Sequence, residues 1–330
     1  MRLQNRNQIA YLGALALLFS YAEMILPRFV PFLRLGLGNI PILLALNLSF
    51  PSFLILELLK SFAACLTAGT LFSPFLIISV AQSLASGILM YGLNKIKGGW
   101  ISLYGISILG SAASSIVQLF LSALYLGRGT YSFAGIMLLF SIFSGIATAF
   151  AASKIELKSE YNYRSLDESI SLNHSESPQN KLSFVKKYAK FLKLFFILAA
   201  VILVFMNQNM HIACGFVLLA FIFQKISGRR LLLLPYLGLW LFVIISCIIS
   251  PAGRVLFEFH GFTITKTALE IGILKALKLT AAASLSQTAA GIKFSTNTLV
   301  GLTLAYFNQL CQTFKNTPGN IFTKIKTMLQ

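Results

Sequence analysis

Acidic residues are scarce in this sequence. Nine aspartates and glutamates stand against 27 lysines and arginines among 330 residues, and the only aspartate is Asp167. Chemistry on a diphosphate requires clustered carboxylates that hold Mg²⁺, and the sequence has no acidic cluster of the DDxxD type. It also lacks the glycine-rich phosphate loop G-x-x-x-x-G-K-[ST]. We therefore expect that this chain by itself neither hydrolyses nucleotides nor catalyses a diphosphate reaction.

Motifs for metal ions and nucleophiles are missing as well. The three histidines, His174, His211 and His260, lie far apart and belong to no H-E-x-x-H pattern, and there is no G-x-S-x-G motif. The four cysteines lack C-x-x-C spacing and are interpreted as small apolar packing residues. We expect no catalytic residue, no bound metal and no cofactor.

Charged residues of both signs make up only 11% of the chain, whereas 57% of the residues are hydrophobic and the mean hydropathy is +0.79. A soluble domain carries about 25% charged residues, so the sequence predicts an all-α polytopic membrane protein. The net charge of +18 has two interpretations, nucleic-acid binding and contact with anionic lipid headgroups. Because most basic residues flank apolar segments, we expect membrane lipid as a partner and no nucleic acid.

Six apolar segments in the first half predict a six-helix membrane module over residues 1–152, since a span needs about 20 apolar residues. The second segment is short and follows an irregular stretch, as expected for backbone that lines a cavity. The segments are Ile9–Leu26, Asn39–Phe50, Ser52–Leu71, Pro74–Leu93, Ile101–Leu124 and Phe133–Ala152.

The composition changes at residues 153–188, which are rich in Ser, Asn, Glu and Lys and predict a hydrophilic linker. A second helical module is predicted over residues 189–330. In its segment Thr265–Ala290, charged side chains cover about half of the helical wheel, so we expect this helix at an interface or beside a cytoplasmic partner. The other predicted helices are Phe191–Met206, His211–Gln224, Leu231–Ser250 and Thr298–Thr313.

Loop charge predicts the orientation of the protein in its membrane. With six spans before the linker, the basic residues of the N-terminus, of the linker and of loop 225–230 fall on one side, which is then cytoplasmic. We expect a bacterial cytoplasmic (inner) membrane, with the N-terminus and the linker in the cytoplasm.

The stretch Pro27–Asn47 places Arg28, Arg34 and Asn39 among prolines and glycines, between two apolar segments. Polar groups in or near hydrocarbon are costly unless they line a cavity or find partners. We therefore interpret this stretch as one wall of a ligand site.

Polar side chains inside the apolar segments complete the predicted site. Glu57 and Lys60 lie three residues apart and can pair on one helix face, with a purely structural pair as the alternative. Gln82 and Gln118 also lie in apolar segments, where an interhelical hydrogen bond is the alternative role. The predicted site binds a small polar or anionic solute and consists of Arg28, Arg34, Asn39, Glu57, Lys60, Gln82 and Gln118.

Small residues form a flat face on the first predicted helix. Ala10 and Ala14, with Gly13 beside them, allow another helix to approach closely. We interpret Ala10 and Ala14 as a docking face between modules, and ordinary packing within the first module is the alternative.

Three stretches of the first half resemble the Gx transporter family, which is also labelled heptaprenyl diphosphate synthase component I. They are RLGLGNIPILLALNL (Arg34–Leu48), SFAACLTAGTLFSPFLIIS (Ser61–Ser79) and ISLYGISILGSAASSIVQL (Ile101–Leu119). This family is similar to the substrate-binding S components of energy-coupling-factor (ECF) importers. The resemblance implies six helices, a small-molecule pocket near the outer face, and docking of a membrane T component on Ala10 and Ala14.

The second half resembles a T component over Pro251–Ala290. The Ala-Arg-Gly motifs with which T components engage their ATPases are missing from the chain. The matching features are a Pro-x-Gly at Pro251 and Gly253, a Thr-x-x-x-Leu at Thr265 and Leu269, and Lys278-Leu279 in place of Arg-Leu.

Three functional hypotheses follow from the residues and the resemblance. The first is an S–T fusion of an ECF-type importer, which takes up a vitamin-like or isoprenoid- or quinone-related solute with ABC-type ATPase subunits supplied in trans. The second is a non-catalytic membrane subunit associated with heptaprenyl diphosphate synthesis. The third is a solitary facilitator or membrane scaffold.

Overall fold

Helices make up most of the chain in the computed structural model, which describes residues 3–25, 36–96, 101–154, 183–228, 233–249, 255–259, 262–289, 294, 296–316 and 318. The all-α class predicted from the sequence is confirmed. The first half contains α1 (Leu3–Ile25), the 3₁₀ turn η1 (Leu37–Asn39), α2 (Ile40–Leu44), α3 (Phe50–Ala68), α4 (Pro74–Lys95), α5 (Leu103–Leu126), η2 (Arg128–Phe133) and α6 (Ala134–Lys154). The second half contains α8 (Ser183–Met206), α9 (Met210–Ile226), α10 (Leu233–Ile248), β1 (Val255–Phe259), β2 (Phe262–Thr265), α11 (Lys266–Ala289) and α12 (Leu299–Asn316).

Four described helices are long and apolar enough to cross a membrane, namely α3, α4, α5 and the continuous segment Arg128–Lys154. Three shorter apolar helices follow in the second half, over Leu192–Met206, Met210–Ile226 and Tyr236–Ile248. The chain is therefore a polytopic membrane protein. Two short antiparallel strands, β1 and β2, form a hairpin that the sequence analysis did not predict.

Proline, serine and glycine mark the helix boundaries of the first half. Ser73 is an extended residue before Pro74, which begins α4 at a position where its missing N–H costs nothing. Gly69 ends α3 with a φ of 70°, and Gly127 ends α5 with a φ of 110°. These left-handed conformations favour glycine because a side chain there clashes with the backbone.

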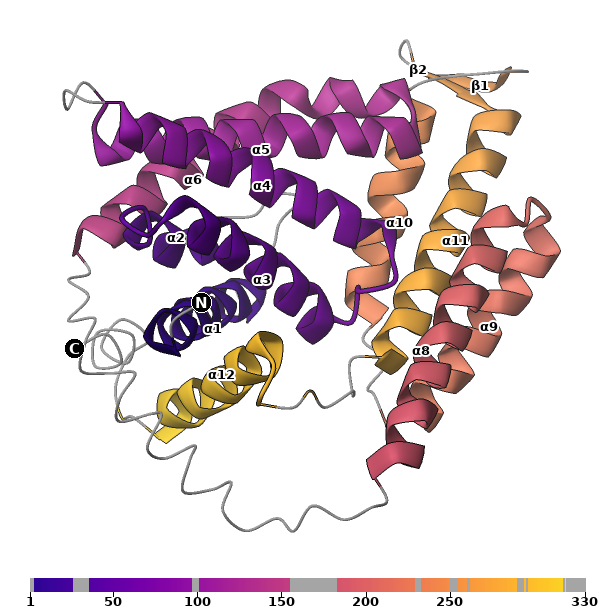
Figure 1. Ribbon diagram of the computed structural model, residues 1–330. Helices are drawn as coiled ribbons and strands as arrows, with labels where there is room; N and C mark the ends of the chain where they lie inside the picture. The colour runs from indigo at the N-terminus through magenta and orange to yellow at the C-terminus, as the bar shows by residue number, and fades with distance from the viewer. Residues whose placement is uncertain are drawn as a thin grey trace.

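The helices of the two halves run in different directions. In Figure 1, α4, α5 and α6 run from side to side, whereas α8, α9, α10 and α11 run from top to bottom. The last described helix, α12, does not join α8–α11 but lies beside α1 in the first half.

The contact between α1 and α12 forms part of the largest apolar core. Tyr11 and Tyr306 meet edge to face with ring centroids 6.2 Å apart, and the rings of Tyr21 and Phe307 are 6.1 Å apart. At the start of α1, the Arg6 guanidinium donates to the backbone oxygens of residues 296 and 297, at 3.0 and 2.9 Å. This C-terminal segment was predicted to be part of the second module, and in space it packs on the first half.

Helix α11 is the central helix of the second half, packed against α8, α9 and α10. Its last three turns, from Leu279 to Ala289, are almost entirely buried. The prediction that this helix lies at an interface or beside a cytoplasmic partner is therefore wrong. Alanine and serine dominate these turns, so neighbouring helices approach closely, and only the first turns, with the Lys266–Glu270 pair at 3.8 Å, are exposed.

Two lysines of α11 bind the ends of other helices. Lys275 Nζ donates to the backbone oxygen of Leu126, the last residue of α5, at 3.0 Å. Lys278 Nζ donates to the backbone oxygen of Phe205, near the end of α8, at 3.1 Å. The last carbonyls of a helix carry partial negative charge and have no partner within the helix. These contacts explain how a helix with two central lysines packs inside the protein.

Replacing Lys275 by methionine is expected to lower the free energy of unfolding by about 1 kcal/mol, because the Leu126 carbonyl loses a charged donor. Unfolding by denaturant in mixed micelles measures this loss. The control is Lys266→Met on the same helix, where the side chain is exposed and no measurable change is expected. Equal stability of the two variants would contradict the capping role of Lys275.

A loop from the first half packs against α11. The N–H of Phe72 donates to Ser286 Oγ at 2.8 Å. A Cβ on Gly69 would lie 2.9 Å from Gln287 Cα, so glycine allows this close approach. Behind it, Gln287 hydrogen-bonds to Gln224 and, at 3.2 Å, to the hydroxyl of Tyr236. The loop between α3 and α4 thus ends on a buried polar network of the second half.

Candidate functional site

A buried ion pair lies inside α3. Lys60 Nζ is 2.7 Å from Glu57 Oε2, and the two residues are only 7% and 0% exposed. The three-residue spacing of Glu57 and Lys60 predicts this pair, and the structure contains it. An ion pair at such a depth is costly to desolvate and needs further polar partners.

Asn39 supplies one such partner. Lys60 Nζ donates to Asn39 Oδ1 at 2.9 Å, which brings two predicted site residues from different segments together. The turn that carries Asn39 starts at Gly36, whose φ is 68°. The buried carboxylate of Glu23 accepts from the N–H groups of Gly36 and Leu37, at 3.3 and 3.1 Å. Glu23 on α1 therefore holds the η1 turn in place over α3, a role that the sequence did not indicate.

Helix α4 approaches the ion pair through a glycine. A Cβ on Gly87 would lie 2.7 Å from Glu57 Oε1, so only glycine leaves room for the carboxylate. The preceding residue, Ser86, has a buried hydroxyl, and a Cβ on Gly110 of α5 would lie 3.3 Å from its Oγ. Gln82 lies one turn earlier on α4. The candidate site is thus enclosed by η1, α3, α4 and α5.

Three buried oxygens at this site have no hydrogen-bond partner among the residues that the structure describes. They are Gln82 Oε1, Ser86 Oγ and Glu57 Oε1, whereas the other carboxylate oxygen of Glu57, Oε2, is 2.7 Å from Lys60 Nζ in the ion pair. Buried polar atoms are nearly always hydrogen-bonded, and each exception calls for an explanation such as a bound molecule. Since carboxylate and amide oxygens only accept hydrogen bonds, the site is suited to a molecule that presents N–H or O–H groups.

The other predicted site residues lie apart from this cluster or cannot be placed. Gln118 is half-buried on α5, two turns from Ser111 on the same helix face. No hydrogen bond described for this part of the chain joins Gln118 to the cluster. Arg28 and Arg34 lie outside the described residues.

The predicted docking residues Ala10 and Ala14 are fully buried in the core that α1 shares with α12. A Cβ on Gly13, between them, would lie 3.0 Å from Leu59 of α3 and 3.2 Å from Thr303 of α12. The small residues of α1 therefore adjoin both halves of the chain.

Metal ligands do not gather in the part of the chain that the structure describes: no three histidine, cysteine, aspartate or glutamate side chains there come close enough to hold an ion. The described side chains of the site offer a bound molecule one ammonium group, one hydroxyl and several acceptor oxygens as hydrogen-bonding groups.

The fold and the site together define a polytopic helical membrane protein with a buried polar cluster in its first half. Residues 12–155 match the family model described as heptaprenyl diphosphate synthase component I, so the sequence-based recognition of this family in the first half is confirmed. Residues 188–289, which include α9, α10 and α11, match a model described as a domain of unknown function (DUF8519). No curated protein and no solved structure matches the chain. Neither match concerns ECF components, so that similarity stays a hypothesis.

Proposed function

We propose that the protein is a transport component that binds a small polar solute in the first half and takes it up into a bacterial cell. It would lie in the cytoplasmic membrane with its N-terminus and linker in the cytoplasm, and ABC-type ATPase subunits would act in trans. The observation that carries the proposal is the group of buried oxygens beside Lys60 that have no hydrogen-bond partner within the described part of the chain. Buried acceptor oxygens beside a charge-compensated pair support binding of a solute that donates hydrogen bonds.

The charges and hydrogen-bonding groups of the site limit which kinds of solute can bind there. Glu57 and Lys60 compensate each other, and two of the three N–H donors of the Lys60 ammonium are directed at Glu57 and Asn39. Glu57 Oε1 and Gln82 Oε1, which have no partner among the described residues, are hydrogen-bond acceptors. A solute with several N–H or O–H groups would donate hydrogen bonds to these acceptors, whereas a purely apolar solute would not.

A second candidate function is that of a non-catalytic membrane subunit associated with heptaprenyl diphosphate synthesis. It is favoured by the description of the family model that matches residues 12–155. In that case a separate acidic subunit would supply the clustered carboxylates that hold Mg²⁺ during a diphosphate reaction.

Replacing Gln82 by leucine is expected to weaken solute retention at least about fivefold, since one neutral hydrogen bond contributes about 1 kcal/mol. Small molecules that stay with the purified protein would be identified and quantified by mass spectrometry. The matched control is Gln312→Leu, at an exposed position of α12 far along the chain from the site. If Gln82→Leu retains as much solute as the wild type, Gln82 does not contribute to solute binding.

Activity assays on the purified protein distinguish transport from a role in biosynthesis. Proteoliposomes that take up the retained solute only with co-expressed ATPases and ATP would support the importer. Uptake without any ATPase would instead favour a solitary facilitator. Prenyltransferase activity that depends on this chain would favour the second candidate.

A further inference from the structure

Two lysines of α11 and a tyrosine of α5 lie close together where the two halves of the chain are in contact. Lys275 Nζ donates to the backbone oxygen of Leu126 and lies 6.0 Å from the centre of the Tyr125 ring. Lys278, one turn further along α11, donates to the backbone oxygen of Phe205. The rings of Tyr125 and Phe205 meet edge to face with their centroids 6.0 Å apart. The ends of α5 and α8 therefore adjoin over one face of α11.

Several hydrogen-bond donors of this group are unused among the described residues. The hydroxyl oxygen of Tyr125 is buried and has no hydrogen-bond partner there. An ammonium group carries three N–H donors, and the contacts described for Lys275 and Lys278 include one hydrogen bond each. Buried polar groups are nearly always hydrogen-bonded, and each exception calls for an explanation such as a bound ion. Since ammonium groups only donate hydrogen bonds, the group that binds here has to be an acceptor.

The positive charge of the two lysines is only partly compensated. The C-terminal end of a helix carries about half a negative charge, so the ends of α5 and α8 together offset about one of the two positive charges. No ion pair in the described part of the chain includes Lys275 or Lys278, and both side chains are half-buried. A charge without a partner is costly inside a membrane protein. The remaining charge of about +1 matches an anion with a single negative charge.

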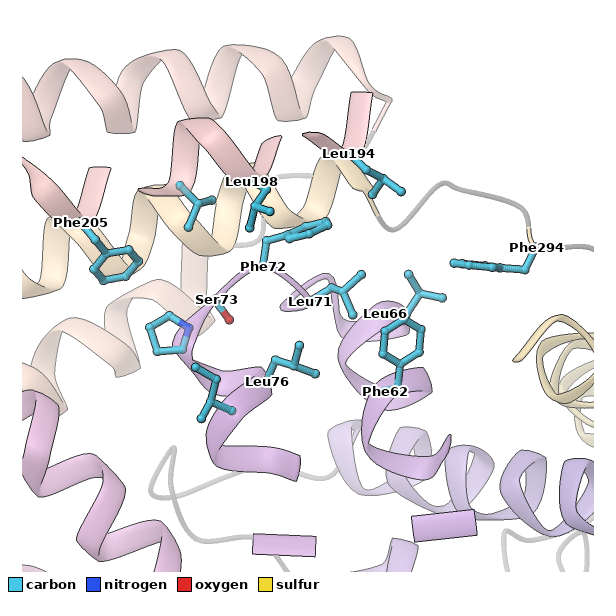
Figure 2. Close-up of a pocket in the computed structure, with 13 residues that line it drawn as sticks. Phe62, Leu66, Leu71, Phe72, Ser73, Leu76, Leu194, Leu198, Phe205 and Phe294 are labelled. Carbon is cyan, nitrogen blue, oxygen red and sulfur yellow. The ribbon is translucent and has the colours of Figure 1, made fainter. Parts of the chain in front are cut away.

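The surroundings of this group favour a lipid as the source of the anion. Leu126 ends a helix that is long and apolar enough to cross a membrane, so it lies near the level of the lipid headgroups. Leu124 and Met206, beside the two bound carbonyls in the sequence, are 69% and 76% exposed and can contact acyl chains. Figure 2 shows Phe205 at one end of an apolar pocket. A phosphodiester at this level has both the required charge and apolar chains attached to it.

We propose that Tyr125, Lys275 and Lys278 bind the phosphodiester group of one membrane phospholipid. The two ammonium groups pair with its negative charge, and the Tyr125 hydroxyl donates to one of its oxygens. The lipid contacts the ends of α5 and α8 and the middle of α11, and it thereby joins the two halves. This binding site is separate from the polar cluster at Glu57 and does not depend on the proposed function.

The test follows the melting temperature of the full-length protein, purified in a mild detergent and stripped of lipid, as lipid is added. Phosphatidylglycerol is expected to raise the melting temperature of the wild type, because a ligand that binds the folded state stabilises it. Diacylglycerol with the same chains lacks the phosphate and should not. Tyr125→Phe should need at least about fivefold more phosphatidylglycerol for the half-maximal shift, and Lys275→Gln/Lys278→Gln at least about tenfold more.

The variants are chosen so that the fold is kept. The Tyr125 hydroxyl has no described partner to lose, and the glutamine amides of the lysine variant can still donate to the carbonyls. Elution and melting without lipid confirm that each variant is folded. The matched controls are Tyr104→Phe, at an exposed position near the start of α5, and Lys266→Gln, in the exposed first turn of α11. Both should respond to phosphatidylglycerol as the wild type does.

Inorganic phosphate distinguishes a free anion from a lipid. If it stabilises the wild type at the same concentration as phosphatidylglycerol, the site binds free phosphate and the assignment to a lipid is wrong. Equal responses of the wild type, Tyr125→Phe and the double lysine variant to phosphatidylglycerol would overturn the proposal. Stabilisation by diacylglycerol as large as that by phosphatidylglycerol would also overturn it, since the phosphate would then not be recognised.

Discussion

Replacing Lys60 by methionine is expected to lower the free energy of unfolding by about 3–5 kcal/mol, the usual cost of leaving one buried charge without its partner. Glu57 is fully buried, and no other described residue donates a hydrogen bond to it that would replace the contact with Lys60 at 2.7 Å. Asn39 would lose its donor at the same time. Denaturant titration in mixed micelles measures the loss. The control Lys225→Met, at an exposed position in the last turn of α9, should change stability by less than about 0.5 kcal/mol.

The double variant Glu57→Gln/Lys60→Met separates a structural role from a functional one. Removing both charges together should restore most of the lost stability, because a neutral pair in a buried position is often tolerated. If the double variant is stable but no longer retains solute, the pair contributes to binding. A Lys60→Met protein as stable as the wild type would mean that Glu57 is not a buried charge.

Replacing Gly69 by alanine is expected to cost about 2–4 kcal/mol. The left-handed backbone, with a φ of 70°, accounts for about 1–2 kcal/mol of this. The new Cβ would also lie 2.5 Å from Gln287 Cγ and 2.9 Å from its Cα, so the α3–α4 loop must move away from α11. The hydrogen bond from Phe72 to Ser286 would then weaken.

Gly228 provides a matched control for this substitution. Its φ is 73°, and nothing lies within 4 Å of the position that a Cβ would take. Gly228→Ala therefore measures the backbone cost alone, and the difference between the two variants measures the contact between the halves. Equal destabilisation would show that the approach of Gly69 to α11 adds nothing to stability.

Helix positions could be predicted from the sequence because they depend on local information. The predicted segment Pro74–Leu93 begins at the same residue as α4 and ends two residues earlier, and Ile101–Leu124 is shifted from α5 by two residues. Apolar length and proline positions mark the ends of a span. The hairpin was missed although Val255–Thr265 reads VLFEFHGFTIT, with two β-favouring runs around His-Gly.

Partners of helices could not be predicted in the same way. The charged pattern of α11 suggests a surface, yet Lys275 and Lys278 find carbonyls at the ends of α5 and α8, which lie far away in the sequence. The three-residue spacing of Glu57 and Lys60 on one helix predicted their pairing. Asn39 and Lys60 are 21 residues apart on different elements, so their spacing in the sequence does not predict a hydrogen bond. The burial of the Ser86 hydroxyl could not be predicted either. It depends on the close approach of α3, α4 and α5 at Gly87 and Gly110, and the hydroxyl has no hydrogen-bond partner among the described residues.

The pairing of α1 with α12 also has a consequence for folding. Arg6 bonds to a residue 291 positions later in the chain, so this contact closes a loop that contains almost every other helix. During synthesis α1 emerges first, and α12 can cover its apolar core face only after nearly all of the described chain has been synthesised. The loop-closure entropy must be overcome before this contact contributes stability. We therefore expect docking of α12 to be a late step, after which α1 first resists proteolysis.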